Sequence, residues 1–564
     1  MTPGPDDLFT RGRGQPGVVR LALAALLLDL VLILPNHPDA MTWAALKLVP
    51  LELPAILSVM LVLPGRGRIA GLLPLVLALV LGCGMVLKLA DLATFTAFNR
   101  PFNLLVDLPL VAAGWTLLSG NVGTPAAAGA IAVALLAVVA ATAASGWAMA
   151  QWRARRLPRR LRPVVGLVAG IALAVMVVDI GHVRAGWRPD PPGAAFTARL
   201  ALEEVESWHR TAGDLAEFRA ATRLDPVAEA ARDGVPLFDR LQGRDLIVLF
   251  VESYGRTSFD TAFYRDSHLP VLRHAEAEIG AAGLSMRSGY LRSPIEGGQS
   301  WLAHGTVASG LRIGDQTRYG ALLRSGRETI WSLAGAAGLA TTAVMPAISY
   351  AWPEGTALGF GQILAADDMG YRGRPFNWIT MPDQYTLSVI ERRLAAPGHP
   401  QTVLQSALIS SHAPWTPVAR MRDWADVGDG RIFDGADWPD ETPESVWSDP
   451  DDVRAHYRDT IAYSLTAVGD FAARQGAAKG GRAPLIVVLG DHQPAGFVSQ
   501  MDSRDVPVHV IGPADLVDDV AGDWATGLVP DATAAGAGLE TLRDRLIRGL
   551  SAGLPAPQRQ AALP

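Results

Sequence analysis

Two kinds of hydrophobic pattern divide the chain near residue 182. Before that point lie five long apolar runs, at about 17–34, 42–63, 69–88, 125–149 and 163–181. Each approaches the roughly 20 residues that a helix needs to cross the hydrocarbon core of a bilayer. From residue 245 the apolar runs are short, rich in β-branched residues and separated by helical patterns. The pattern predicts a membrane domain followed by an α/β domain.

The second part predicts an α/β fold with a mostly parallel sheet covered by helices on both faces. Its strand-like runs are continuous rather than alternating, as in strands that are buried on both faces: "LIVLFVES", "TTAVMPA", "TVLQSALISS", "LIVVLG" and "VPVHVIG". Helical patterns lie between or after them, at about 299–311, 327–338, 383–395, 452–476 and 539–550. Ligands bind such sheets beyond the carboxyl ends of the strands, so polar residues there are candidate site residues.

We expect three parts: a transmembrane domain of about five spans (1–181), a linker with an amphipathic helix (182–240), and an extracytoplasmic catalytic domain (241–564). The linker contains the breaker "RPDPPG" and then a helical pattern, which we expect to pack on the soluble domain rather than on the membrane surface. A shorter apolar stretch at 104–118 contains Asp107 and is expected to lie in the interface or to be re-entrant.

The positions of Lys and Arg predict the orientation. With a cytoplasmic N-terminus and five crossings, three basic clusters face the cytoplasm: Arg11, Arg13 and Arg20; Arg66 and Arg68; and "RARRLPRRLR" at 153–162. This arrangement satisfies the positive-inside rule and places residues 182–564 outside. Four ionisable residues inside the runs leave two readings open, a functional role or a structural one as an internal ion pair or at a position near the headgroups: Asp29, Lys47, Glu52 and Asp179.

The composition agrees with a membrane protein. Of the 564 residues 49% are hydrophobic, and the mean hydropathy of +0.22 is high for a soluble protein. The net charge of −6 provides no basic surface, so we expect no nucleic-acid partner. Cys83 is the single cysteine of the chain, which excludes a disulfide framework.

Polar residues at two strand ends and one helix start predict a metal-dependent site. Glu252 ends "LIVLFVE", and Asp491 and His492 follow "LIVVLG". Oxygen and nitrogen ligands held on rigid elements suit a divalent cation. Ser300 follows a Gly-Gly turn in "SPIEGGQSWLAHGTVASGL", at the start of a predicted helix, where an anion is stabilised. A serine near a bound metal is a competent nucleophile.

These motifs, with Ser–x–His–x–Pro in "ISSHAPW" between them, resemble those of the alkaline phosphatase superfamily over about residues 245–550. The chain is most similar to the membrane-tethered sulfatase-like branch, which includes lipoteichoic acid synthase, phosphoglycerol transferases of periplasmic glucans and phosphoethanolamine transferases. The resemblance implies one divalent ion, Mn²⁺, Mg²⁺ or Zn²⁺. It implies four metal ligands: Glu252, Ser300, Asp491 and His492. It also implies a bacterial cytoplasmic (inner) membrane location with a periplasmic catalytic domain.

The resemblance implies further roles around this centre. His412 matches a histidine that contacts the transferred phosphate or the leaving group. Trp352 and Glu354, in "YAWPEG", fall where relatives bind the substrate headgroup, although the usual arginine is absent there. His304 and His509 are interpreted as structural.

The implied reaction is transfer of phosphoglycerol or phosphoethanolamine from a membrane phospholipid to an envelope glycan or lipid, through a covalent serine intermediate. Two alternatives stay open: a sulfatase-like phosphodiesterase or hydrolase, and a non-catalytic sensor that binds a glycan. A formylglycine sulfatase is disfavoured because His304, not Arg, stands at the fifth position of the run that begins with Ser300. The disulfide-rich lipid A transferases are disfavoured because no cysteine follows Cys83.

The predicted orientation can be tested with fusions at residue 190. An alkaline phosphatase fused there should be active and a cytoplasmic reporter inactive, because the basic clusters keep the preceding loops inside. The opposite pair of activities would contradict the orientation.

Overall fold

The computed structural model describes residues 16–555 except for 64–67, 99, 109–110, 112–113, 116–117, 120–122, 156, 186, 188–192, 377–378, 435–441 and 480–481. The chain divides into two compact units, Met1–Thr96 with Arg100–Gly213, and Ala97–Asn99 with Asp214–Pro564. This division falls inside the helix that the sequence predicts for the linker.

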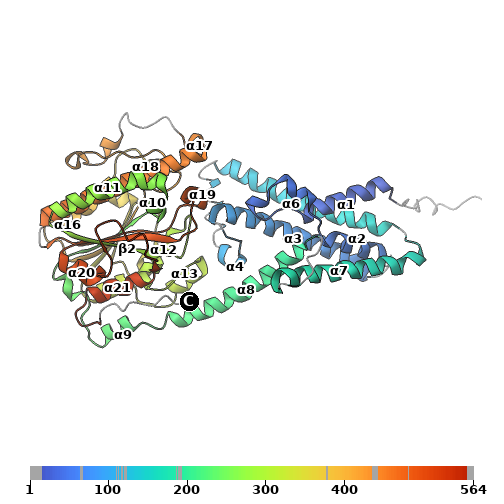
Figure 1. Cartoon of the computed structure of the whole chain (residues 1–564), viewed down its shortest axis with the longest axis horizontal. Helices are drawn as coiled ribbons and strands as arrows, with labels where there is room; N and C mark the ends of the chain where they lie inside the picture. The colour runs from blue at the N-terminus through green and yellow to red at the C-terminus, as the bar shows by residue number, and fades with distance from the viewer. Residues whose placement is uncertain are drawn as a thin grey trace, which may run out of the picture. The chain divides into compact units, whose positions relative to one another are not determined.

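The first unit is helical (Figure 1). Its α-helices are α1 (Val18–Leu32), α2 (Glu52–Val62), α3 (Arg68–Phe98), α4 (Leu104–Asp107), α6 (Thr124–Ala154), α7 (Arg162–Ala185) and the first part of α8 (Phe196–Ala221). Three helical segments of the described chain are long and apolar enough to cross a membrane: Gly71–Thr96, Thr124–Ala154 and Arg159–Ala185. They match three of the predicted spans. Helices α1 and α2 have only 15 and 11 residues, so the count of five stays a prediction.

The apolar run at 42–63 is not one continuous helix. A 3-10 turn at Trp43–Lys47 precedes Pro50, and α2 begins only at Glu52. Proline has no N–H to donate and disfavours a helical residue before it, so the helix restarts after it.

The three long helices agree with the predicted orientation. If α3, α6 and α7 each cross, Arg68 and the basic cluster at 153–162 lie on one side, and the chain after α7 emerges on the other. Arg11, Arg13, Arg66 and Arg156, which contributed to that prediction, lie outside the described residues, as does much of 109–118.

Carboxylates of the membrane helices hold the start of α8. Glu52 accepts hydrogen bonds from the N–H groups of Thr197 (2.7 Å) and Ala198 (3.3 Å). Asp179 accepts from Ala195 N (2.9 Å) and pairs with Arg199. Negative groups at a helix N-terminus stabilise the helix. The linker helix was expected to pack on the soluble domain, but its first turns contact the membrane helices instead.

The second unit is built on one mixed sheet in the order β4-β3-β5-β1-β6-β7-β2-β8, with β9 paired to β2. The strands are β1 (Leu246–Val251), β2 (Ser285–Arg292), β3 (Ala340–Met345), β4 (Gln362–Ala365), β5 (Thr402–Leu408), β6 (Leu485–Gly490), β7 (Asp505–Gly512), β8 (Ala525–Thr526) and β9 (Ala537–Gly538). The pairs from β4 to β6 are parallel, as predicted, but β7 is antiparallel to β6. Between β6 and β7 the chain forms only the short helix α19 (Gly496–Ser499), not a long helical crossover.

Helices cover both faces of this sheet (Figure 1). One face carries α10 (Thr257–Asp260), α11 (Ala262–Ala281), α16 (Asp383–Leu394), α17 (Pro443–Val446) and α18 (Pro450–Lys479); the other carries α9 (Pro226–Arg232), α12 (Ser300–Ser309), α13 (Gln316–Leu323), α14 (Ile330–Ala336), α20 (Ala514–Ala521) and α21 (Thr541–Gly549). Strand β1 alternates between the two hydrophobic cores: Ile247, Leu249 and Val251 join one, and Leu246, Val248 and Phe250 join the other. Both faces of β1 are therefore filled, and its polar residues come only at its end.

Candidate metal and nucleophile site

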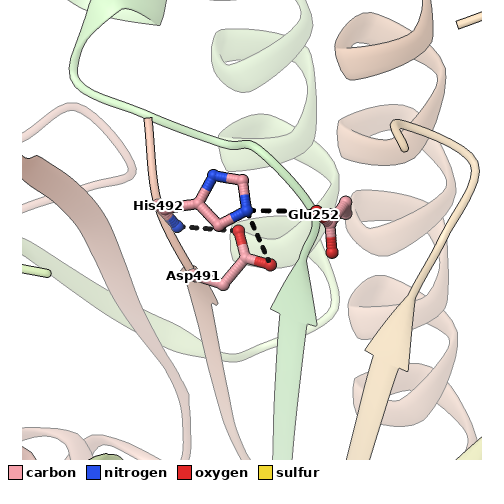
Figure 2. Close-up of side chains that lie close together, drawn as sticks. All are labelled: Glu252, Asp491 and His492. Atoms are coloured by element: carbon pink, nitrogen blue, oxygen red, sulfur yellow. Dashed lines mark hydrogen bonds and ion pairs between the residues drawn. The ribbon is translucent and has the colours of Figure 1, made fainter. Parts of the chain in front are cut away.

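The site forms where three parallel strands end together. Val251, the last residue of β1, pairs with Leu408 of β5 on one side and with Gly490 of β6 on the other. The residues that follow these strands therefore emerge at one edge of the sheet. Glu252 follows β1 and Asp491 follows β6 (Figure 2).

Glu252, Asp491 and His492 bring their side chains together at this edge (Figure 2). One ligand atom of each lies within 4.8 Å of the others. The Nε2 atom of His492 lies 3.2 Å from Glu252 Oε1 and 3.9 Å from Asp491 Oδ2. The three residues are only 7%, 0% and 1% exposed, respectively. The cluster is therefore shielded from bulk water.

The backbone around the cluster prepares two donor atoms for a cation. Asp491 Oδ1 accepts from the N–H groups of Ser253 (2.8 Å) and His492 (2.7 Å), while its buried Oδ2 has no hydrogen-bond partner in the described part of the chain. His492 Nδ1 lies 2.8 Å from the carbonyl oxygen of Gln493. Because a carbonyl only accepts, Nδ1 carries a proton, so Nε2 is the ring nitrogen that would bind a cation between the carboxylates. This donor set fits a divalent cation.

The charges of these three residues also favour binding of a cation. Burial and the negative charge of Glu252 both raise the pKa of Asp491. Burial alone would lower the pKa of His492, but the two carboxylates raise it to about 9. For Glu252, burial acts to raise the pKa, yet the hydrogen bond from His492 and the charges of His412 and His492 lower it. Without a metal the cluster thus retains protons, which a divalent cation would displace.

Ser300 is the first residue of α12 and reaches the same cluster. Its Oγ lies 2.9 Å from Glu252 Oε2, 3.1 Å from Glu252 Oε1 and 3.3 Å from His492 Nε2. The turn before it uses positive φ at Gly297 (74°), Gly298 (142°) and Gln299 (65°). This backbone suits glycine, which explains the Gly-Gly pair. Ser300 is half-buried, so this candidate nucleophile is more accessible than the buried cluster beside it.

His412 follows β5, next to β1 in the sheet. Its Nδ1 lies 2.6 Å from Ala413 O, and its charge acts on Glu252. Trp352 packs instead on Phe360, with ring centroids 6.1 Å apart. Glu354 lies in α15 (Pro353–Ala357). Among the described contacts none joins Trp352 or Glu354 to the cluster, and their substrate roles stay predictions.

The other two histidines lie outside the group of ligand atoms. His304 is buried against Phe250, with ring centroids 4.1 Å apart. His509 lies in β7 and contacts Ser288 Oγ (2.7 Å) and Tyr254 OH (3.1 Å). These contacts agree with the structural interpretation of both.

Two supporting residues could not be found from the sequence. Asp383, fully buried at the start of α16, accepts from Ile409 N (2.8 Å) and Ser410 N (2.9 Å) and so holds the loop after β5. Ser411 donates from Oγ to the backbone oxygen of Glu252 (2.7 Å), which ties this loop to the end of β1. The only local signal of Asp383 was that of an ordinary acidic residue in a first helical turn.

Comparison with solved structures finds proteins of the kind that the sequence resembles. The chain is similar to the lipoteichoic acid synthase LtaP from Listeria monocytogenes (14% identity, 61% of this chain and 78% of that chain, TM-score 0.38). It is similar to the Streptococcus pyogenes phosphoglycerol transferase GacH (15%, 60% and 81%, TM-score 0.34) and to the C-terminal periplasmic domain of EcEptC from Escherichia coli (11%, 57% and 91%, TM-score 0.35). No family model matches the chain, and no curated protein does. At these identities and TM-scores the matches carry no conclusion about activity.

The donor set predicts stoichiometric binding of one divalent ion with release of protons. Glu252→Gln should weaken binding by more than the about 10–100-fold that loss of an outer-shell partner costs. Glu296→Gln is the matched control, because Glu296 is a neighbouring carboxyl outside the cluster. Titration calorimetry with Mn²⁺ in buffers of different ionisation enthalpy measures the affinity for the ion and the number of protons released. Affinity should fall as the pH falls, since protons compete at Asp491 and His492. Equal affinity for the Glu252→Gln and control variants would contradict the site.

Proposed function

We propose that the chain is a membrane-tethered, metal-dependent phosphotransferase. It moves a phospho-alcohol headgroup, phosphoglycerol or phosphoethanolamine, from a membrane phospholipid to an envelope glycan or lipid. The donor lies in the membrane that holds the three long apolar helices, so tethering keeps the catalytic unit at a high local concentration of donor. The proposed location is the bacterial inner membrane, with the catalytic unit in the periplasm.

One observation carries the proposal: the Ser300 hydroxyl lies within 3.3 Å of both Glu252 and His492, in a cluster whose buried Asp491 Oδ2 has no hydrogen-bond partner in the described chain. A serine in an ordinary helix cap would bond to the backbone of its own first turn. Here its Oγ bonds to the cluster instead. A nucleophile next to a preformed cation site is the arrangement that phosphoryl transfer requires.

In the first half-reaction a bond forms between Ser300 Oγ and the donor phosphorus, and the bond from phosphorus to the diacylglycerol oxygen breaks. The serine proton is balanced by the proton that the diacylglycerol oxygen gains. In the second, an acceptor hydroxyl attacks the same phosphorus, the bond to Oγ breaks, and the acceptor proton restores the serine. Two displacements at one phosphorus need no oxidant or further reactant.

The chain's own groups have distinct tasks in this scheme. Glu252 orients the serine hydroxyl by accepting its hydrogen bond. The first turn of α12 has N–H groups without intrahelical acceptors, which suit phosphate oxygens. His412 is proposed to contact the phosphate or to protonate the leaving oxygen. A divalent cation held by Glu252, Asp491, His492 and Ser300 would supply positive charge that polarises the phosphate and favours the deprotonated serine.

The covalent step predicts an adduct. Wild-type protein incubated with donor lipid and no acceptor should gain the mass of phosphoglycerol or phosphoethanolamine on the peptide containing Ser300, and diacylglycerol should appear. Ser300→Ala should lose both signals while staying folded, because Ser300 Oγ bonds to Glu252 and His492 and does not cap α12. Intact-mass and peptide mass spectrometry measure the adduct. Undiminished transfer by Ser300→Ala would eliminate the covalent mechanism.

Substitution of His412 should affect turnover but not metal binding, unlike substitution of a metal ligand. His412→Ala should slow diacylglycerol release by about 10²–10⁴-fold, the usual contribution of a general acid. Its metal content should stay at the wild-type level, because His412 is not in the group of close ligand atoms. Metal analysis beside the turnover assay distinguishes the two roles. Loss of metal together with activity would show that His412 is a ligand instead.

A further inference from the structure

A large apolar cavity lies within the first unit, separate from the catalytic cluster. Its volume is about 1010 Å³, and it is lined mainly by α3 and α6, with Leu104 and with Glu204 and Trp208 of α8. Both α3 and α6 contain helical segments that are long and apolar enough to cross a membrane. The cavity therefore faces the hydrocarbon region of a bilayer rather than water.

The length of this cavity along α3 exceeds one leaflet. Along α3 the lining extends from Pro74 to Leu87, which at 1.5 Å per residue is about 20 Å. A hydrocarbon core of about 30 Å has leaflets of about 15 Å. The wall residues Leu79 and Val86 are 53% and 49% exposed, so the cavity opens toward lipid. These dimensions suit an acyl chain.

A carboxylate without a partner lies in the lining. Glu204 Oε2 is buried and has no hydrogen bond within the described part of the chain. Burial raises the pKa of Glu204, and the charges of Asp91, Glu203 and Asp107 raise it further; every charged group that acts on Glu204 is another carboxylate. Within the described part of the chain, no cationic side chain pairs with Glu204.

The two neighbouring buried carboxylates are already satisfied. Asp91 accepts from Asn36 Nδ2 (3.0 Å) and from the N–H of Phe102 (2.9 Å). Asp107 pairs with Arg100. Of these three carboxylates, Glu204 is therefore the one without a partner in the described part of the chain.

The carboxylate lies at the outer end of the cavity. Helix α8 follows the last long apolar helix, and Asn103, just after α3, donates to Ser207 (2.7 Å) and Thr211 (3.0 Å) of α8. Under the predicted orientation this end faces the outer leaflet. Trp208, one turn after Glu204, is 45% exposed, as expected for an aromatic residue at headgroup level.

We infer that this cavity binds a phospholipid of the outer leaflet with a primary ammonium headgroup, its acyl chain between α3 and α6 and its ammonium on Glu204. A glycerol headgroup has no cation, so it would leave Glu204 unpaired and bring a net negative charge toward Asp91 and Asp107. Resting on the proposed function, the inference also selects the donor: an ethanolamine phospholipid, with phosphoethanolamine as the transferred group.

Binding can be measured without turnover. Full-length protein carrying Ser300→Ala, in detergent, is titrated with phosphatidylethanolamine or phosphatidylglycerol of identical chains and followed by native mass spectrometry. The ethanolamine lipid should bind more tightly. Adding Glu204→Gln should lower that preference about tenfold, which corresponds to about 1.4 kcal/mol. Glu217→Gln, an exposed glutamate on the same helix, is the control and should leave the preference unchanged.

A second variant tests whether the cavity binds the acyl chain of the lipid. Ala143, an exposed residue of α6 in the lining, can be enlarged without burying the new side chain in the core. Ala143→Phe should weaken binding of both lipids equally. Equal binding of the two headgroups by the parent, or binding that Ala143→Phe does not change, would overturn the site.

A further assay distinguishes failure of the donor assignment from failure of the proposed function. With wild-type protein and labelled lipids, a phosphoethanolamine adduct on Ser300 supports the assignment, and a phosphoglycerol adduct overturns it while the proposed function survives. If neither lipid gives an adduct, both the proposed function and the donor assignment fail. The binding site is then judged by the Ser300→Ala titrations alone.

Discussion

The second unit depends on one electrostatic constraint: two carboxylates, Glu252 and Asp491, are buried together where the parallel strands β1 and β6 end. Burying a charge without compensation is costly, and two like charges at close range raise that cost. In the structure His492 and the backbone N–H groups on Asp491 Oδ1 compensate part of it. The oxygen that remains, Asp491 Oδ2, has no partner in the described chain and accounts for the need for a cation.

This constraint explains much of the surrounding backbone. A side chain at Gly490 would collide with the backbone oxygen of Tyr254, so glycine lets the segment after β1 pass close to the end of β6. Ser253 adopts φ of +58°, and Tyr457 donates to its carbonyl oxygen (2.9 Å). With Asp383 and Ser411 fixing the loop after β5, three strand ends are tied to one another. If the cluster binds a cation, as proposed, this rigidity would hold its ligands in place against their mutual repulsion.

Helices and strands whose pattern lies within one segment could be predicted from the sequence. Strand direction and contacts between distant segments could not. The helices expected at 383–395 and 452–476 appear as α16 and α18, because their apolar spacing is complete within each segment. The strand "VPVHVIG" was recognised, but its antiparallel direction was not, since a strand buried on both faces has the same apolar pattern in either direction. Asp383 was missed because its partners lie 26 and 27 residues away.

The candidate metal ligands were accessible to sequence analysis because each comes directly after a strand, or at a helix start with a glycine turn. Trp352 and Glu354 had no such anchor, and the structure gives Trp352 a packing partner in Phe360. The same distinction separates the acidic residues of the membrane helices. Asp179 and one oxygen of Glu52, Oε1, accept hydrogen bonds from the start of α8, which gives both residues a structural task. Glu204 accepts no such bond from the described part of the chain. A buried carboxylate at a cavity therefore becomes informative only when the hydrogen bonds around it are known, because the sequence shows the charge but not whether the fold has compensated it.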